Sequence, residues 1–158
     1  MTAFVECIFI SPDAGLPMQL VERVMAIAGV GLEGDRYAFG RGAWQRTAGR
    51  GLPKHITLIE IESIEIANGK RQEQFTPIET RRNILTSGVQ LNKLIGKNFM
   101  VGGVALKGIE LADPCPRPST LAGKKDKQSF TKLFAGMGGL RCAILSSGII
   151  ARNDTIVL

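Results

Sequence analysis

The sequence has few of the residues on which most metal sites and acid–base active sites depend. It contains a single histidine, His55, and three cysteines that form no Cys-x-x-Cys pair. A structural zinc site needs four such ligands, so neither a zinc site nor a histidine-based metal centre is expected. Catalysis by a Ser-His or Cys-His pair could use only His55. The odd number of cysteines also argues against a framework of disulfides.

Long apolar runs and targeting signals are missing as well. No run approaches the roughly 20 apolar residues that a membrane-spanning helix needs. The N-terminal stretch MTAFVECIFISPD lacks the basic region and the cleavage site of a secretory signal. The chain has 158 residues, of which 44% are apolar and 22% are charged. It is therefore expected to form one cytoplasmic domain over residues 1–158, with a core of its own.

Positive charge exceeds negative charge, with a net charge of +6 and a pI near 9.6. Such a protein attracts anions. Nucleic acid is one candidate, but aromatic residues that could stack on bases are few: one Trp, one Tyr and seven Phe. A basic cleft for a small phosphorylated ligand fits the charge equally well. A nucleic-acid-binding module therefore stays a remote alternative.

Short apolar runs bounded by glycine and other turn residues predict a mainly β protein. We expect strands over 4–10, 55–60 and 83–88, a hairpin over 97–113 that turns at Gly102-Gly103, and three strands within 140–158. Short helices are expected over 61–69, 89–96 and 126–136. The order shows no βαβ alternation, which argues against a doubly wound parallel sheet. A closed or strongly curled β-barrel with a few short helices is the predicted fold, and the aperiodic stretch 36–54 is a predicted surface loop.

The stretch ADPCPRPSTLAG, residues 112–123, places Cys115 between two prolines and puts Arg117 before a third. Proline restricts its own φ and the residue before it, which predicts a rigid, non-helical loop that presents a thiol. A thiolate is both a nucleophile and a ligand for soft metals. Most free cysteines are buried and inert, and this is expected of Cys7 and Cys142, which lie in apolar strands. The polar, proline-rich surroundings argue against that fate for Cys115.

Two further segments combine glycine with arginine. GVGLEGDRYA, residues 29–38, has three glycines that allow a close backbone approach to a ligand, followed by Asp35 and Arg36. It lacks the spacing of a phosphate-binding loop, and a turn with an exposed Asp-Arg pair is an equal alternative. GMGGLRCAIL, residues 136–145, could bring Arg141 to a ligand or could form a simple turn between a helix and a strand.

A third segment, ETRRNI over 79–84, holds two adjacent arginines and an amide. In a strand, Arg81 and Arg82 would point to opposite faces. One of them could then line a cavity, where its planar guanidinium suits phosphate or carboxylate. A pair of solvated arginines is the simpler alternative.

Taken in order, these segments resemble a MOSC domain, the family named after the C-terminal domain of molybdenum cofactor sulfurase. The matching segments are GLEGDRYA, ITLIEIESIE, TRRNILTSGVQLNKLIGKNFMVGGVALKGIELADPCPRP, GMGGLRCAIL and GIIARNDTIVL. The resemblance runs from about residue 3 to residue 158. It implies a β-rich barrel similar to the barrel domain of pyruvate kinase. It also implies binding of the molybdenum cofactor (molybdopterin), a pterin with a dithiolene that holds the metal and a phosphate.

The resemblance also assigns roles to residues. Cys115 matches the family's signature cysteine, which acts as a catalytic metal ligand or as a carrier of sulfane sulfur. The family's Asp-Arg pair matches Asp35 and Arg36, and its Arg-Asn pair matches Arg82 and Asn83. Together with the arginines singled out above, Arg81, Arg117 and Arg141, these are the expected cofactor-binding residues. Where the family often has histidine after its Asp-Arg pair, this sequence has Tyr37.

The function implied is reduction of N-hydroxylated substrates or handling of the cofactor's sulfur. The alternative is a persulfide carrier without turnover of its own. The sequence lacks the cysteines for an iron–sulfur cluster and shows no desulfurase domain. Electrons or sulfur would therefore come from a separate protein, and no membrane partner is expected.

Overall fold

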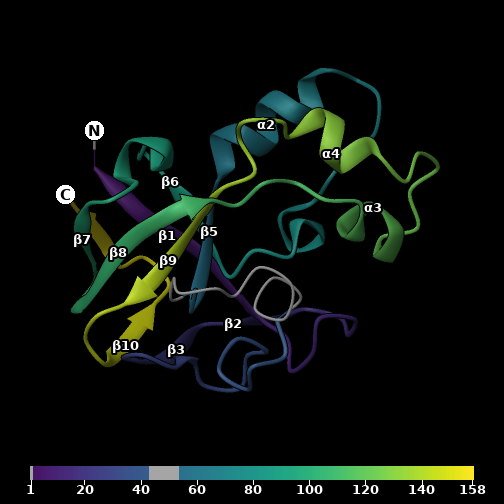
Figure 1. Ribbon diagram of the computed structural model, residues 1–158. Coiled ribbons are helices and arrows are strands. Elements are labelled where there is room, and N and C mark those ends of the chain that lie inside the picture. Colours follow the sequence, from purple (N-terminus) through teal and green to yellow (C-terminus); the bar gives the residue numbers. More distant parts are fainter. Residues whose placement is uncertain (1, 43–53) are drawn as a thin grey trace.

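A seven-stranded β-barrel that closes on itself is the centre of the fold (Figure 1). The computed structural model describes residues 2–42 and 54–158. Neighbouring strands follow the order β11-β7-β8-β9-β5-β6-β1, and β11 pairs back with β1, with Ala3 opposite Ile156. The strands are β1 (Ala3–Ile10), β5 (Ile56–Glu60), β6 (Ile84–Ser87), β7 (Asn98–Val101), β8 (Val104–Leu111), β9 (Leu140–Ile144) and β11 (Thr155–Val157). The predicted barrel is confirmed, while most of the predicted 36–54 loop lies outside the described residues.

A smaller sheet lies against one side of the barrel. It is antiparallel, with β10 (Gly148–Ala151) and β4 (Gly31–Leu32) on either side of β3 (Arg23–Ile27). A further short strand, β2 (Gln19–Val21), pairs with β1 and extends the barrel wall. The three strands predicted within 140–158 are confirmed, but β10 belongs to this second sheet.

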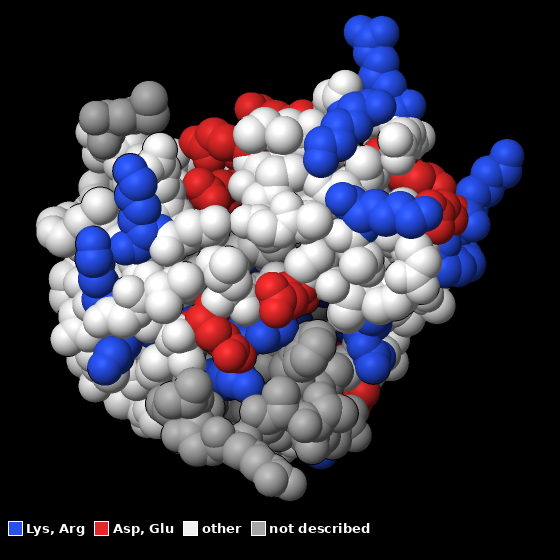
Figure 2. All heavy atoms as spheres, turned by 45° about the horizontal axis from the view of Figure 1, so that its top comes forward, with Lys and Arg blue, Asp and Glu red and all other residues white. Residues whose placement is uncertain are grey.

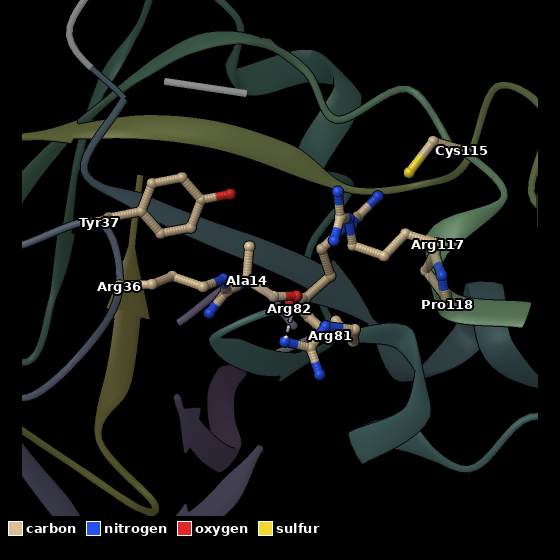
Figure 3. A pocket seen from close by; sticks show the side chains of 8 residues that line it. All are labelled: Ala14, Arg36, Tyr37, Arg81, Arg82, Cys115, Arg117 and Pro118. Carbon is tan, nitrogen blue, oxygen red and sulfur yellow. Dashed lines mark hydrogen bonds between the residues drawn. The ribbon is translucent and has the colours of Figure 1, made fainter. Parts of the chain in front are cut away.

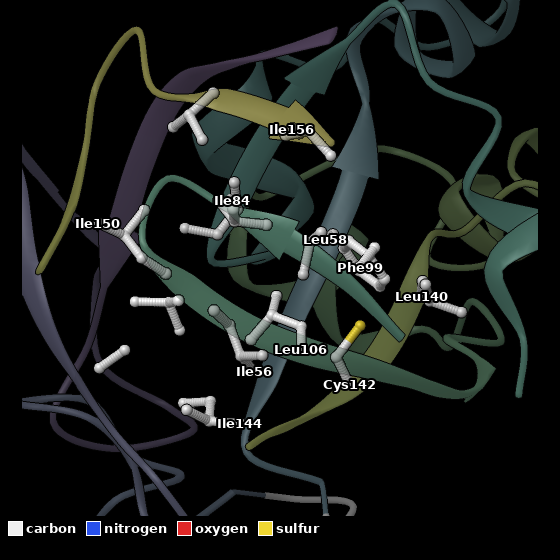
Figure 4. Packing of buried hydrophobic residues seen from close by; sticks show 14 of the residues in the cluster. Ile56, Leu58, Ile84, Phe99, Leu106, Leu140, Cys142, Ile144, Ile150 and Ile156 are labelled. Carbon is white, nitrogen blue, oxygen red and sulfur yellow. The ribbon is translucent and has the colours of Figure 1, made fainter. Parts of the chain in front are cut away.

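The barrel interior is filled mainly by apolar side chains. Strand residues alternate between the two faces of a sheet, and the inward positions are occupied by buried Ile, Leu, Val and Phe together with Cys142 (Figure 4). Leu58, Ile84 and Leu106 are fully buried there. Burial of each such side chain stabilises the fold by about 1.5–3 kcal/mol.

The helices lie together at one end of the barrel (Figure 1). They are α2 (Ile61–Gly69), α3 (Arg117–Leu121) and α4 (Ser129–Leu133), with the 3-10 turn η1 (Pro77–Thr80). A second 3-10 turn, η2 (Leu91–Leu94), lies apart from them, and its leucines join the barrel core. A second apolar cluster fills the space between them and the outer barrel wall. Within it, the rings of Phe130 and Phe134 stack with centroids 4.4 Å apart, and Phe75 meets both edge-on. None of the helices in the described ranges is long and apolar enough to cross a membrane.

Two of the helix predictions need correction in extent. The helix over 61–69 is confirmed, but the one expected over 126–136 covers only Ser129–Leu133. The segment 89–96 forms one 3-10 turn that buries Leu91 and Leu94 and leaves Ile95 exposed.

The expected absence of a βαβ unit was wrong at one place. Strands β5 and β6 are parallel neighbours, with Leu58 opposite Ile84. The chain between them passes through α2, because parallel neighbours require a crossover connection. Since this crossover ends just before β6, it also brings Arg81 and Arg82 to the helical end of the barrel.

Candidate functional site

Four arginines and a cysteine from separate parts of the chain line one cavity beside α3 (Figure 3). The empty space between them, including its open mouth, is about 360 Å3. Its lining residues are Ala14, Arg36, Tyr37, Arg81, Arg82, Cys115, Arg117 and Pro118. We call this cavity the thiol pocket. It contains five of the eight predicted site residues.

Cys115 reaches the pocket from the loop that follows β8. It is half-buried, and its sulfur points toward the arginine side chains (Figure 3). The prediction of a non-helical loop over 112–123 was wrong in its second half, because α3 begins at Arg117. Pro118 lies in the first helical turn, where its missing N–H costs no hydrogen bond.

The other two cysteines lie away from this pocket. Cys142 is buried in the barrel interior, and burial raises the pKa of its thiol well above the usual range. Cys7 lies in β1, and burial raises the pKa of its thiol as well. Both thiols are therefore held in the neutral form, in agreement with the inert role expected for them.

The two adjacent arginines lie before β6, so the opposite orientations considered for a strand do not apply to them. Arg81 ends η1 with a φ of 61°, a left-handed conformation that is uncommon for any residue other than glycine. Its Nη2 donates to the carbonyl oxygen of Ala14 at 2.9 Å, while the Nε of Arg82 donates to that of Gly138 at 2.8 Å. Both side chains are buried, so the alternative of a solvated pair is wrong.

The charges of these arginines are poorly compensated. Burial lowers the pKa of Arg81 to about 10, and repulsion from Arg36 and Arg117 adds to the lowering. The pKa of Arg82 is also about 10, again mainly because of burial, with repulsion from Arg141 and Arg36 adding to it. Both groups stay charged at neutral pH, and no carboxylate is among the residues that line the thiol pocket. An anionic ligand would relieve this repulsion.

Arg36 is the one arginine of the pocket with a carboxylate partner. Its Nη1 lies 2.9 Å from Oδ1 of Asp35, and this pair is buried rather than exposed as the simpler alternative held. The other bonds of Asp35 come from the backbone N–H groups of Ser11 and Tyr37. Asp35 therefore fixes the loop that carries Arg36, and Nη2 of Arg36 in turn donates to the carbonyl oxygen of Arg81 at 2.8 Å.

Asn83 and Arg141 also lie outside the pocket lining. The side chain of Asn83 is fully buried; it donates to the carbonyl oxygen of Phe9 and accepts from the N–H and the hydroxyl of Thr57. It thus joins β6 to β1 and β5. Arg141 lies on β9 and contacts Glu110 at 3.1 Å. These two predicted site residues and Asp35 have evident structural partners.

Three lining residues were not predicted: Ala14, Tyr37 and Pro118. Tyr37 is buried, and the guanidinium of Arg36 lies 4.8 Å from the centre of its ring. Its hydroxyl is directed toward the interior of the pocket (Figure 3). Its position directly after Arg36 was the available signal. For Ala14, the only available signal in the sequence was the turn-rich stretch SPDAG over 11–15.

The pocket offers one metal ligand, Cys115. Within residues 2–42 and 54–158, no three His, Cys, Asp or Glu side chains come together in a way that could hold a metal ion. His55 does not contribute, because its Nδ1 accepts the backbone N–H of Ile144 at 2.9 Å. A metal bound here would have to bring most of its ligands with it, as a metal held in an organic cofactor does.

The sequence model of the MOSC domain matches residues 45–157 of this chain. The chain belongs to the MOSC domain family. The match leaves out β1, which nevertheless closes the barrel. No match was found among curated proteins.

Solved structures share the fold of this MOSC domain. The YuaD protein from Bacillus subtilis has a TM-score of 0.80 at 23% identity, and the alignment covers 99% of this chain and 94% of that one. YiiM from Geobacillus stearothermophilus has a TM-score of 0.71 at 13% identity, with 99% and 74% covered. YiiM from Escherichia coli has a TM-score of 0.65 at 16% identity, with 100% and 69% covered. At these identities the likeness concerns the fold alone.

The distribution of charge bears on the nucleic-acid alternative. Figure 2 turns the helical end of the molecule toward the reader. Lys and Arg side chains on this face are interspersed with uncharged atoms and with Asp and Glu groups (Figure 2). Among the described residues on this face, Lys and Arg form no continuous stripe of the kind that follows a phosphate backbone (Figure 2).

Proposed function

We propose that this MOSC domain binds the molybdenum cofactor in the thiol pocket, with Cys115 as the protein's ligand to the metal. The observation that carries the proposal is a half-buried thiol that faces four arginines in a lining without a carboxylate. The donor set fits such a cofactor. Its dithiolene supplies sulfur ligands that the chain lacks, a single thiolate suits a soft metal centre, and arginine suits its phosphate and its pterin oxygens.

The arginines of the pocket differ in how many of their hydrogen-bond donors are left for a ligand. Arg117 is exposed and makes no hydrogen bond or ion pair within the described part of the chain, so all its donors are available. Arg81 uses only Nη2, and Arg82 uses Nε and Nη2, for bonds to backbone carbonyl oxygens. Their remaining donors can meet a ligand while these bonds hold each side chain in place. Binding therefore requires little reordering of the site.

When bound, the cofactor supplies two-electron redox chemistry. The reaction proposed is reduction of an N-hydroxylated compound: R–NH–OH, two electrons and two protons give R–NH2 and water. The electrons come from a separate electron-transfer protein. Tyr37 is placed to hold a proton at its hydroxyl, inside the pocket and opposite Cys115.

The test is reduction of an N-hydroxylated base by cofactor-loaded protein with a reconstituted electron donor. We expect Cys115→Ser to abolish turnover and Cys7→Ser to retain it, because Cys7 lies in β1 outside the pocket. Turnover that survives in Cys115→Ser would exclude the reductase role proposed for this thiol.

A second function is supported by the same thiol. A persulfide on Cys115 would be an anion among arginines, which favours sulfur carriage without turnover. Incubation with a cysteine desulfurase and cysteine should then add about one sulfur to Cys115. Absence of this adduct in mass spectra of the wild type would rule out the carrier role.

A further inference from the structure

A second cavity adjoins the thiol pocket and shares Arg81 and Pro118 with it. Its empty space, including the open mouth, is about 440 Å3. Its lining residues are Pro17, Met18, Ile78, Glu79, Arg81, Pro118, Leu121 and Ala122. We call it the apolar groove, because six of its eight lining residues are apolar.

The groove is built from the same segments that shape the thiol pocket. Pro118, Leu121 and Ala122 belong to α3 or follow it directly, and α3 begins two residues after Cys115. Met18 forms part of the opposite wall, and its sulfur lies 3.6 Å from Nη1 of Arg36. A ligand in the groove would therefore contact α3, the helix that begins two residues after the thiol of Cys115.

An exposed apolar side chain stands at the rim of this groove. Leu121 is 45% exposed, whereas Pro118 of the same helix is buried. Exposed leucines are common singly, but this one lines a cavity that adjoins the pocket of a half-buried thiol. Its apolar surface would be covered if an apolar ligand occupied the groove.

The two charged residues of the groove differ in their availability. Glu79 is engaged: it caps η1 through Thr76, and Lys124 lies 3.2 Å from its carboxylate. Arg81, at the boundary of the two cavities, keeps donors that no described residue uses. The groove therefore offers a hydrogen-bond donor to a ligand, but no free anion.

We propose that the apolar groove is a subsite for the flat, apolar body of a small neutral or anionic organic ligand. The polar end of this ligand passes Arg81 and reaches Cys115. Insofar as it names a substrate, this inference rests on the proposed function. It then specifies N-hydroxylated compounds that carry a ring or another apolar group, in preference to hydroxylamine itself. Cationic compounds are disfavoured because four arginines line the path to the thiol.

Alkylation of Cys115 tests the subsite without any metal or cofactor. The probes are iodoacetamide, N-benzyl-iodoacetamide and iodoacetate. Each reaction forms an S–C bond, releases iodide and leaves the thiol proton to the solvent. Rates at Cys115 are measured by peptide mass mapping, which separates it from Cys7 and Cys142. They are divided by the rates of the same reagents with glutathione to remove intrinsic reactivity.

We expect the benzyl reagent to react faster than iodoacetamide by about tenfold after this correction, the discrimination typical of an added apolar group in a pocket. The corrected rate of iodoacetate should also exceed that of iodoacetamide, because the four arginines of the pocket attract its carboxylate. Ala122→Trp, which fills the groove, should remove the benzyl preference and leave the iodoacetate preference unchanged. Ala151→Trp, on β10 in the second sheet, is the matched control and should retain both.

If Ala122→Trp does not fold, Leu121→Ser serves instead and should reduce the benzyl preference. Equal corrected rates for the benzyl reagent and iodoacetamide in the wild type would overturn the subsite. An equal benzyl preference in wild type and Ala122→Trp would overturn it as well. Neither result depends on molybdenum, so a failure of the subsite and a failure of the cofactor proposal are distinguished.

Discussion

The barrel interior and the thiol pocket are built on opposite principles. The interior holds apolar side chains that need no partner beyond one another. The pocket holds four arginines, three of which have no carboxylate partner among residues 2–42 and 54–158. Buried charges without counter-charges cost stability. The interior therefore accounts for the stability of the fold, whereas the arginines of the pocket are accounted for by the anionic ligand that we propose.

The same contrast separates two groups of polar residues. Asp35 and Asn83 have side chains whose hydrogen bonds are used within the protein. Arg81, Arg82 and Arg117 keep unused donors at the pocket surface. The first group holds neighbouring segments in place, and the second group has donors left for the ligand that we propose.

Truncation of the interior should have the largest effect on stability. Leu106 is fully buried in the barrel, and Leu106→Ala should lower the free energy of unfolding by about 2–5 kcal/mol, measured by urea denaturation. Well below its melting temperature, this variant should retain the iodoacetate preference of Cys115. Loss of that preference in the folded variant would show that the two regions are not separate.

Asn83→Ala should also destabilise, by about 1–3 kcal/mol for a buried group left without its partner. The amide joins three strands. Asn92→Ala is the control, since its amide makes one exposed bond to the carbonyl oxygen of Gly136. Unchanged stability together with lost cofactor binding would instead assign Asn83 to the ligand.

Arg117→Glu should weaken anion binding and leave the free energy of unfolding unchanged within about 0.5 kcal/mol. Inorganic pyrophosphate, an anionic probe, should raise the melting temperature of the wild type through binding to the folded state. In Arg117→Glu its affinity should fall by about tenfold, since charge-assisted hydrogen bonds are lost. Arg23→Glu changes the net charge equally but lies on β3. An equal loss of pyrophosphate affinity in both variants would show that only the net charge of the protein matters, and would contradict a contact from Arg117.

The smallest effect concerns His55 and pH. Burial lowers its pKa below the usual 6.5, so the unfolded chain takes up the proton first. The free energy of unfolding should therefore fall as pH decreases from about 7 to about 5.5, because protonation competes with the bond from the N–H of Ile144. His55→Gln should show a flatter dependence in urea titrations. Parallel curves would contradict this assignment.

The sequence predicted the strands well because alternation and turn residues are local signals. It could not predict that Ala3 pairs with Ile156, since nothing local brings the two ends of the chain together. The helix at Arg117 was missed because proline is tolerated in a first turn. The arginines and Cys115 were found through their motifs. A motif does not show whether its residues line a cavity or hold neighbouring segments together, so it could not predict that Asp35 and Asn83 lie outside the lining of the thiol pocket.

The most direct test of the account is the molybdenum and pterin content of protein purified from a host that makes the cofactor. Wild type, Cys115→Ser and Cys7→Ser are compared after identical purification. We predict metal and pterin at about one per chain in the wild type and in Cys7→Ser, and a clear loss of both in Cys115→Ser. Equal molybdenum and pterin in all three proteins would contradict the claim that Cys115 and its arginines form the cofactor site.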